Sequence, residues 1–216
     1  MRLSRSDPDA DRLITPRREE IFSLLARYIS EIELYNPALS LVGTDERQGL
    51  IIRHILDSLG PLGSISRLAA ERGPRIADVG SGAGLPGIPL AIVMPDAEFT
   101  LIERKGRRAG FLRDTQTALG LTNVSVEEAE MEKTETGRFS LITFRAFKPL
   151  EPKIFKKLFR LCGKGGCLAA YKGRREKIEA EMVALEKALP VIAGRWELIR
   201  CSVPLLDEER HLLVIK

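Results

Sequence analysis

The first 65 residues carry hydrophobic positions at helical spacing. From about Pro16 these positions predict an amphipathic helix. They are Ile21, Leu24, Leu25, Tyr28, Ile29 and Ile32. The pair Asn36-Pro37 predicts the end of this helix, because proline disfavours helical backbone in the residue before it. A second helix, stopped by Gly60-Pro61-Leu62-Gly63, is predicted from Leu50, Ile51, His54, Ile55 and Leu59. Residues 1–15 are polar, and we expect them to be frayed.

From Arg75 onward, short apolar runs alternate with helical patterns. Strands are predicted at 75–79, 98–103, 123–127, 139–144, 166–171, 195–201 and 210–215, with helices at 86–94, 107–119, 150–162 and 174–189. Strands separated by helices indicate a mainly parallel sheet covered on both faces. Only Ser202 to Glu209 separate the last two strands, too few residues for a helical crossover, so this pair is predicted to be antiparallel. We expect an α/β core over 66–216 and a helical extension over 1–65, forming one structural unit.

A glycine-rich turn, Asp78-Val79-Gly80-Ser81-Gly82-Ala83-Gly84-Leu85-Pro86-Gly87, joins the first strand to the next helix. Glycine lets a backbone turn sharply and approach a ligand closely. The pattern G-x-G-x-x-G within this turn is a weak signal by itself. The next strand ends in Glu103, about 20 residues downstream, where a carboxylate can accept hydrogen bonds from ribose hydroxyls. The turn and the acid together predict an adenosine-type ligand, either NAD or S-adenosylmethionine.

Composition narrows the class of protein. The chain has 216 residues, 44% hydrophobic and 30% charged, which is typical of a globular protein. It has no apolar run long enough for a bilayer and no signal-peptide core at its N-terminus. The three cysteines, Cys162, Cys167 and Cys201, form no close pair and no zinc spacing, so we expect reduced thiols, no metal site and a cytoplasmic location. A net charge of +4 mildly favours a polyanionic partner.

Several stretches outside the turn match a known family. They are Tyr35-Asn36, Arg53-His54-Ile55-Leu56-Asp57-Ser58, Gly106-Arg107-Arg108, Phe111-Leu112-Arg113, Arg145-Ala146-Phe147, Tyr171-Lys172-Gly173 and Glu209-Arg210-His211-Leu212. With the glycine turn, they make the chain resemble the RsmG (GidB) family of 16S ribosomal RNA guanine-N7 methyltransferases from about residue 20 to the end. The resemblance implies a class I, Rossmann-like methyltransferase fold, S-adenosylmethionine as cofactor, and a guanine in a conserved loop of small-subunit ribosomal RNA as target.

The residues and the resemblance together give a set of expected cofactor contacts. Asp78 is expected to face the charged end of the cofactor, and Glu103 to hold the ribose hydroxyls. Backbone at Gly80, Gly82 and Gly84 is expected to lie against the methionine part. The resemblance adds Leu85, Met131, Glu132 and Arg145. Read without the resemblance, Met131 is a core residue and Glu132 a solvated surface acid.

No catalytic residue is predicted. Methyltransferases that act on amino groups carry an Asn/Asp-Pro-Pro-aromatic motif after the fourth strand, where this chain has Arg145-Ala146-Phe147-Lys148-Pro149. The lone pair of guanine N7 needs no base, so positioning is the main requirement. An arginine that occupied N7 would prevent the reaction, so Arg145 is assigned to phosphate, cofactor or O6 contact. His54 and His211 are predicted to be structural.

Basic residues cluster after the second and fifth strands and on the helix at 150–162. Such clusters are either solvated surfaces or surfaces that track phosphates. We expect RNA contacts from Arg107, Arg108, Lys172, Arg174 and Arg175. The expected partner is 16S ribosomal RNA or a small-subunit assembly intermediate. We expect the protein to be a monomer and to bind no membrane.

The chain departs from the family pattern in places, with Pro37, Ser40-Leu41-Val42 and Glu130-Met131-Glu132 standing where the family usually has other residues. Two other functions stay open at this stage. An NAD-dependent oxidoreductase would use the bare glycine pattern, and a non-catalytic RNA-binding module would retain only the fold.

Overall fold

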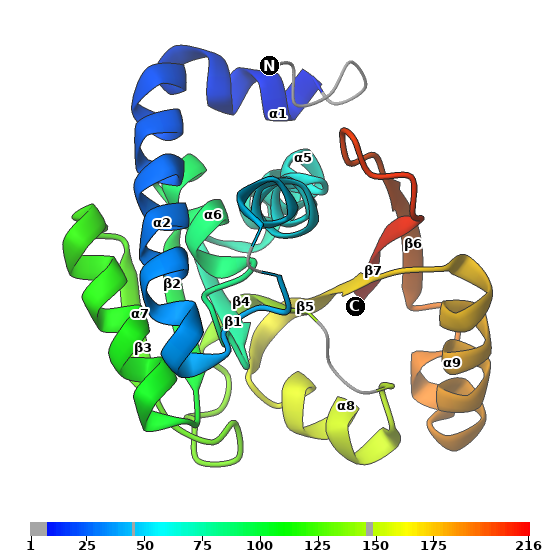
Figure 1. Ribbon diagram of the computed structural model, residues 1–216. Helices are drawn as coiled ribbons and strands as arrows, with labels where there is room; N and C mark the ends of the chain where they lie inside the picture. Colours follow the sequence, from blue (N-terminus) through cyan, green and yellow to red (C-terminus); the bar gives the residue numbers. More distant parts are fainter. Residues whose placement is uncertain (1–7, 45, 146–148) are drawn as a thin grey trace.

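The computed structural model describes residues 8–44, 46–145 and 149–216 (Figure 1). A series of helices precedes the sheet. They are α1 (Pro8–Ile14), the 3-10 helix η1 (Thr15–Arg17), α2 (Arg18–Leu39), α3 (Arg47–Leu50), the π-helical segment η2 (Ile51–Leu56), α4 (Asp57–Leu59) and α5 (Leu62–Arg72). Both expected N-terminal helices are present, the second one as the run from α3 to α4.

Three features of these helices differ from expectation. Helix α2 continues past Asn36-Pro37 to Leu39 and ends at Ser40, whose left-handed backbone (φ 47°) lets its N–H donate to the Asn36 carbonyl. Proline is tolerated there because it removes one hydrogen bond only in the last turn. Residues 8–14 are helical rather than frayed, since Ala10 and Ile14 are buried. Helix α5 begins directly after the Gly60-Pro61 turn and was not predicted.

Seven strands form one sheet in the order β3-β2-β1-β4-β5-β7-β6. Their bounds are β1 (Arg75–Val79), β2 (Glu98–Glu103), β3 (Val124–Glu128), β4 (Phe139–Arg145), β5 (Cys162–Lys172), β6 (Trp196–Cys201) and β7 (Arg210–Ile215). All strand predictions are confirmed to within a residue except that β5 begins at Cys162. Strand β7 pairs antiparallel with β5 and with β6, and the other pairs are parallel, which confirms one antiparallel strand. It lies between β5 and β6 rather than at the edge of the sheet.

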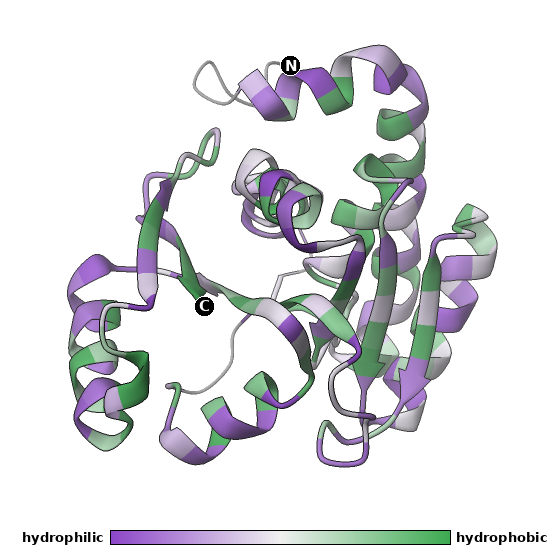
Figure 2. Cartoon of the chain, turned by 180° about the vertical axis from the view of Figure 1, so that it is seen from behind, coloured by the Kyte–Doolittle hydropathy of each residue, from purple (hydrophilic) through white to green (hydrophobic). Residues whose placement is uncertain are grey.

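Helices cover both faces of the sheet. The helices that follow β1 are α6 (Gly87–Val93), α7 (Gly106–Leu119), α8 (Pro152–Phe159), α9 (Arg175–Ala188) and the 3-10 helix η3 (Pro190–Ile192). Alternate strand residues point to opposite faces, so Ile76 belongs to the core that includes residues of α2, α5, α6 and α7, whereas Ala77 belongs to the core that includes residues of α8 and α9. Figure 2 shows that the strands are mostly hydrophobic and that the surrounding helices present polar residues. The N-terminal helices therefore share one hydrophobic core with the sheet.

The strand order locates a crevice. Strands β2 and β3 lie on one side of β1, while β5, β7 and β6 follow on the far side of β4. Ligands in open α/β sheets bind outside the carboxyl ends of the strands where the order reverses, which here is at β1 and β4. The glycine turn follows β1 at this edge. Within the described residues, no helix combines the length and the apolar composition that a membrane span requires.

Candidate active site

Two glycines in the turn after β1, Gly82 and Gly84, are required for different physical reasons. Gly82 has φ +56°, and an added Cβ would meet nothing closer than 3.8 Å, so it is needed for its left-handed conformation. Gly84 has φ +87°, and a Cβ there would lie 2.5 Å from Cδ1 of Ile88. Close packing of the turn against α6 therefore explains Gly84 without a ligand. The turn is also held from α2, because the buried Tyr28 hydroxyl donates to the Ala83 carbonyl at 2.6 Å.

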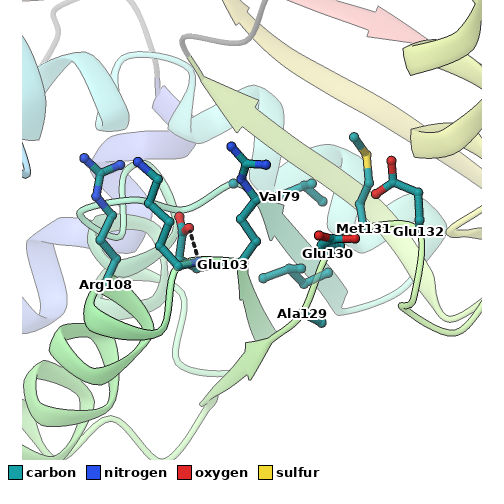
Figure 3. Close-up of a pocket in the computed structure, with 11 residues that line it drawn as sticks. Val79, Glu103, Arg108, Ala129, Glu130, Met131 and Glu132 are labelled. Atoms are coloured by element: carbon teal, nitrogen blue, oxygen red, sulfur yellow. Dashed lines mark hydrogen bonds between the residues drawn. The ribbon is translucent and has the colours of Figure 1, made fainter.

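Glu103 ends β2 and fixes the other side of the turn (Figure 3). Its Oε2 accepts the Gly82 N–H at 2.9 Å, and its Oε1 accepts the Lys105 N–H at 2.8 Å. The side chain is buried, and the residue is 5% exposed. An ionised carboxylate has about four acceptor positions, so about two stay available for hydroxyl donors. This acid can therefore shape the turn and hold a diol at once.

A cleft of about 520 Å³ opens beside Glu103. Its walls come from the ends of β1 and β2 and from the segment after β3, and they include Val79, Gly80, Ile102, Glu103, Met131 and Glu132. The volume is typical of small-molecule sites, which span roughly 300–1,000 Å³. In Figure 3, Arg108 stands on one side of Glu103, with Met131 and Glu132 on the other. The structure thus brings four of the expected cofactor contacts together, namely Gly80, Glu103, Met131 and Glu132.

Two of the cleft residues have further partners inside the protein. The Glu132 carboxylate forms an ion pair with Lys157 of α8, and the Lys157 hydrogen bond lowers the pKa of Glu132. The Met131 carbonyl accepts a hydrogen bond from Arg160, while its side chain packs beside the core under α8 and α9. These contacts fix the backbone that faces Glu103 across the cleft.

Asp78 lies beneath the turn and not in the cleft wall. It is 1% exposed, and its Oδ2 accepts the Gly87 N–H at 3.1 Å. Its Oδ1 makes no hydrogen bond within the described residues, because the Ser81 and Thr143 hydroxyls donate to the carbonyls of Asp78 and Ala77. Burial raises the pKa of Asp78 to about 6 against the opposing Gly87 hydrogen bond. An unpaired buried carboxylate oxygen at this position fits a ligand with a positively charged end.

Leu85 also lies outside the cleft. It is 6% exposed and belongs to the hydrophobic core under the turn. Arg145, the last expected cofactor contact, ends β4 and reaches a different group of residues, which surrounds Asp57. The structure therefore divides the expected contacts between the cleft, the core beneath it and the end of β4.

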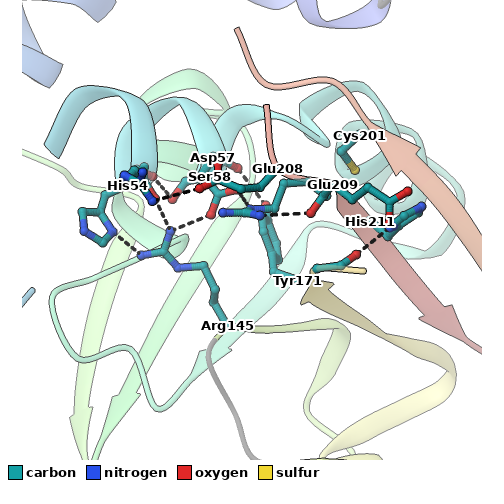
Figure 4. Close-up of polar contacts among 12 residues, drawn as sticks. His54, Asp57, Ser58, Arg145, Tyr171, Cys201, Glu208, Glu209 and His211 are labelled. Carbon is teal, nitrogen blue, oxygen red and sulfur yellow. Dashed lines mark hydrogen bonds and ion pairs between the residues drawn. The ribbon is translucent and has the colours of Figure 1, made fainter. Parts of the chain in front are cut away.

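Asp57 pairs with two arginines, and Figure 4 shows its contact with one of them, Arg145. Arg145 Nη1 lies 3.0 Å from its Oδ2, and Arg210 Nε lies 2.8 Å from its Oδ1. The Asp57 side chain is only 9% exposed, so both of its oxygens are held by charge-assisted hydrogen bonds away from water. The three residues come from α4, from the end of β4 and from the start of β7.

His54 is the fourth member of this group. Its Nδ1 lies 3.1 Å from Arg145 Nη2, and a guanidinium group can only donate, so Nδ1 accepts and the ring proton is on Nε2. Burial, followed by the charge of Arg145, lowers the pKa of His54 to about 4. The imidazole is therefore neutral at physiological pH. His54 lies in the π-helical segment η2, and such segments often occur at functional sites.

These residues line a second cavity of about 320 Å³, together with Tyr171 and His211. It opens at the carboxyl ends of β4 and β5 and at the start of β7. His211 Nδ1–H donates to the Gly173 carbonyl at 2.7 Å, and the Tyr171 hydroxyl donates to the Ser58 carbonyl at 2.8 Å. Asp57 and Arg210 were not predicted as site residues. Both stand in the stretches that carried the family resemblance, which was the only sequence signal for them.

The residues expected to contact RNA have mixed environments. Arg107 and Arg108 donate to the Ala38 and Ser40 carbonyls at the C-terminal end of α2, where carbonyls lack helical partners. Lys172 forms a partly buried ion pair with Glu181 at 2.7 Å. The remaining two, Arg174 and Arg175, begin α9 and are exposed. The stretch from Ala146 to Lys148 lies outside the described residues. No cluster of metal-binding side chains occurs in the described part of the chain.

Comparison with known proteins identifies the family. A family model described as rRNA small subunit methyltransferase G (GidB) matches residues 21–211. The chain is 37% identical over 197 residues to ribosomal RNA small subunit methyltransferase G of Treponema pallidum (strain Nichols), covering 89% of this chain and 84% of the relative. It is 32% identical over 214 residues to the protein of the same name in Leptothrix cholodnii, covering 95% and 94% of the two chains.

Solved structures agree on the fold. A ribosomal protein L11 methylase from Lactobacillus delbrueckii subsp. bulgaricus superposes with a TM-score of 0.55 at 11% identity, covering 81% of this chain and 80% of that one. A SAM-dependent methyltransferase from Aquifex aeolicus gives 0.52 at 19% identity, covering 73% and 90%. The expected class I methyltransferase fold is confirmed. The chain belongs to the rRNA small subunit methyltransferase G family of S-adenosylmethionine-dependent methyltransferases.

Proposed function

We propose that this protein transfers a methyl group from S-adenosylmethionine to N7 of a guanine in a 16S ribosomal RNA loop. The observation that carries the proposal is a pair of cavities at the carboxyl ends of neighbouring strands. One is formed by β1 and β2 around Glu103, and the other by β4, β5 and β7 around Asp57. Family membership supplies the reaction class and the class of RNA.

The first cavity suits the adenosine part of the cofactor. Glu103 has spare acceptor positions for the ribose hydroxyls, and Val79, Ile102 and Met131 supply apolar surface for the adenine. Gly80 gives the methionine part close access to the backbone, and Asp78, buried beneath the turn, would favour its positive charge through the electrostatic field and without direct contact. The bound cofactor supplies a methyl group on a positively charged sulfur.

The chain contributes positioning rather than a base. Guanine N7 has a free lone pair at neutral pH, so no proton has to be removed before it attacks the methyl group. The carboxylate of the second cavity, Asp57, has both oxygens engaged by Arg145 and Arg210, so we assign it to holding these two arginines. Holding the two reactants in line can contribute several kcal/mol to a reaction of this kind, on the order of 7 or more in favourable cases.

The RNA is proposed to lie over the carboxyl edge of the sheet. Arg107, Arg174 and Arg175 are exposed candidates for phosphate contact, although Arg107 also contacts the Ala38 carbonyl and Arg175 also pairs with Glu179. Arg108 and Lys172 would support them from less exposed positions. We further propose that the protein acts as a cytoplasmic monomer on the small subunit or on an assembly intermediate. In the same proposal, residues 1–65 form an extension of the methyltransferase core at 66–216.

Small ribosomal subunits from cells that lack this protein provide the direct test. Purified protein and methyl-tritiated S-adenosylmethionine should label one guanine per subunit, which nuclease mapping would identify as N7-methylated. Subunits from cells that contain the protein serve as the control, because they should already carry the methyl group. A lack of transfer to any small-subunit RNA, or thermal stabilisation by NAD and none by S-adenosylmethionine, would contradict the proposal.

A further inference from the structure

The second cavity has a feature that the methyl-transfer function alone does not require. One of its two histidines, His54, is fixed in one tautomer by a protein partner, and this leaves one ring donor, Nε2–H. We propose that this cavity receives the acceptor guanine and that the His54 Nε2–H donates to guanine O6, so that N7 stays free for the methyl group. The inference rests on the proposed function and names the residue that selects its base.

Arg145 is a poorer reader of the base because it is already engaged. Three of its hydrogen bonds go to protein acceptors, namely Asp57 Oδ2 at 3.0 Å, His54 Nδ1 at 3.1 Å and the Arg53 carbonyl at 3.4 Å. The paired arginine contact to guanine uses both O6 and N7 and would cover the reactive nitrogen. Arg145 is thus a positioning residue, which orients the His54 ring and fixes its proton on Nε2.

The charges around His54 favour a neutral donor. Arg145 and Arg53 raise the local positive potential, while Asp57 opposes it and is itself shared with Arg210. N7-methylation leaves the guanine ring positively charged. A protonated histidine at O6 would repel that product, whereas a neutral imidazole donates one hydrogen bond without adding charge.

A hydrogen-bond donor at the position of His54 Nε2 would distinguish guanine from adenine. Guanine presents the O6 acceptor beside N7, whereas adenine presents an N6 amino donor at the same place. A half-buried donor facing another donor would stay unpaired, and sites built around a hydrogen bond reject analogues that cannot form it. The His54 Nε2–H therefore favours guanine over adenine.

Two substitutions separate the two nitrogens of His54. His54→Asn keeps an acceptor near the position of Nδ1 for Arg145 but removes the donor at Nε2. His54→Gln extends an amide donor toward the position of Nε2 and weakens the contact with Arg145. Each variant is assayed by single-turnover methyl transfer on reconstituted subunits whose ligated 16S RNA carries either guanine or 2-aminopurine at the mapped target. The analogue keeps N7 and lacks O6.

The wild-type protein should prefer guanine over 2-aminopurine by about 10- to 100-fold, as expected for a lost buried hydrogen bond. His54→Asn should slow transfer to guanine by a similar factor and abolish the preference, whereas His54→Gln should retain part of it. Affinity for S-adenosylmethionine, measured by calorimetry, should change less than about twofold in both variants, which also verifies that they are folded.

The outcomes are distinguishable. Equal wild-type rates on the two bases, or a full guanine preference in His54→Asn, would overturn the role of His54 and leave the methyltransferase function intact. Absence of wild-type transfer to guanine would instead overturn the proposed function. If one variant fails to bind S-adenosylmethionine, the other variant is compared with the wild-type protein. Either variant alone tests the preference for guanine over 2-aminopurine.

Discussion

The two cavities at the carboxyl edge of the sheet are built differently. In the cleft beside the ends of β1 and β2, the central acid is held by main-chain groups, since Glu103 accepts the N–H groups of Gly82 and Lys105 within 21 positions of sequence. The second cavity is held by charged side chains, since Asp57 pairs with Arg145 and Arg210 across 88 and 153 positions. A site held by the main chain depends on backbone conformation, whereas a site held by ion pairs depends on the identity of each partner. The two should therefore fail under different substitutions.

The largest effect should come from Gly80→Val. Gly80 has φ +72° and lines the cleft, so a β-branched side chain would be strained and would fill space needed by the ligand. We expect binding of S-adenosylmethionine to weaken by at least about 1,000-fold, or about 4 kcal/mol. Isothermal titration calorimetry measures this. Gly110→Ala is the matched control, because a Cβ there would meet nothing within 4 Å, and affinity should not change. Unchanged affinity in Gly80→Val would contradict the placement of the cofactor.

Asp57→Asn should reduce stability more than it reduces cofactor affinity. It removes the negative charge that Arg145 and Arg210 share and leaves their partly buried guanidinium groups without this partner. The expected loss is about 3 kcal/mol in the free energy of unfolding, measured by urea denaturation. In the control Glu208→Gln, an exposed pair with Arg53 is lost, and about 0.5 kcal/mol or less is expected. Similar losses in the two variants would remove the contrast between buried and exposed pairs.

Two titratable groups, His54 in the second cavity and Asp78 beneath the glycine turn, should make protein stability depend on pH with opposite signs. His54 has a folded pKa of about 4, below its ordinary 6.5, so the unfolded chain binds its proton first and stability falls as pH drops from 6.5 to 4. Asp78 has a folded pKa of about 6, above its ordinary 3.8, so its contribution is present at low pH and is lost as pH rises through 6. Each effect amounts to about 2 to 3 kcal/mol and opposes the other.

Replacing one of these two residues should reveal the pH dependence of stability that the other one causes. Asp78→Asn should leave a protein whose unfolding free energy rises between pH 4 and 6.5, and His54→Asn one whose unfolding free energy falls over that range. Denaturation at half-unit pH steps measures both slopes. Parallel slopes in the two variants would show that the shifted groups have been misassigned.

The smallest effect is expected at the exposed arginines. Arg174→Ala should raise KM for small subunits about threefold and reduce the salt dependence of binding by about one phosphate contact, without altering cofactor affinity. Filter binding between low and moderate salt measures the slope. Arg12→Ala on α1, which removes an exposed charge of the same kind, should leave KM unchanged. An equal effect in both variants would indicate a general charge effect and no local contact.

The difference between the cavities also explains what could be predicted from the sequence. Strand positions, the glycine turn and Glu103 depend on short-range patterns, and the sheet confirms the seven strands. The pairing of Asp57 with Arg210 depends on which strand follows β5 in space, and periodicity carries no such information. For the same reason, the prediction for Arg107 and Lys172 rests on their charge and their place after a strand, which do not reveal that Arg107 contacts the end of α2 and that Lys172 pairs with Glu181. Their predicted role in RNA binding stays a prediction.

Helix α5 shows a different limit. Its buried residues Leu62, Ile65, Leu68 and Ala69 follow helical spacing, so the signal was present. The Gly-Pro-Leu-Gly run before it was read as a long break, whereas the chain needs only two residues, Gly60 and Pro61, to turn between helices. The prediction was wrong about the length of the turn, whereas the hydrophobic pattern does indicate the helix.

The hydrogen bond from Tyr28 to Ala83 links the N-terminal helices to the glycine turn. Tyr28 is fully buried, and its partner is a carbonyl inside the glycine turn, so stiffening of the turn is transmitted to the middle of α2. Amide protons of α2 should then exchange with deuterated solvent more slowly when the cleft is filled, although α2 contributes no wall to it. A shortened chain starting at residue 66 would lose this brace and leave an apolar face of the sheet bare, and we expect it to aggregate.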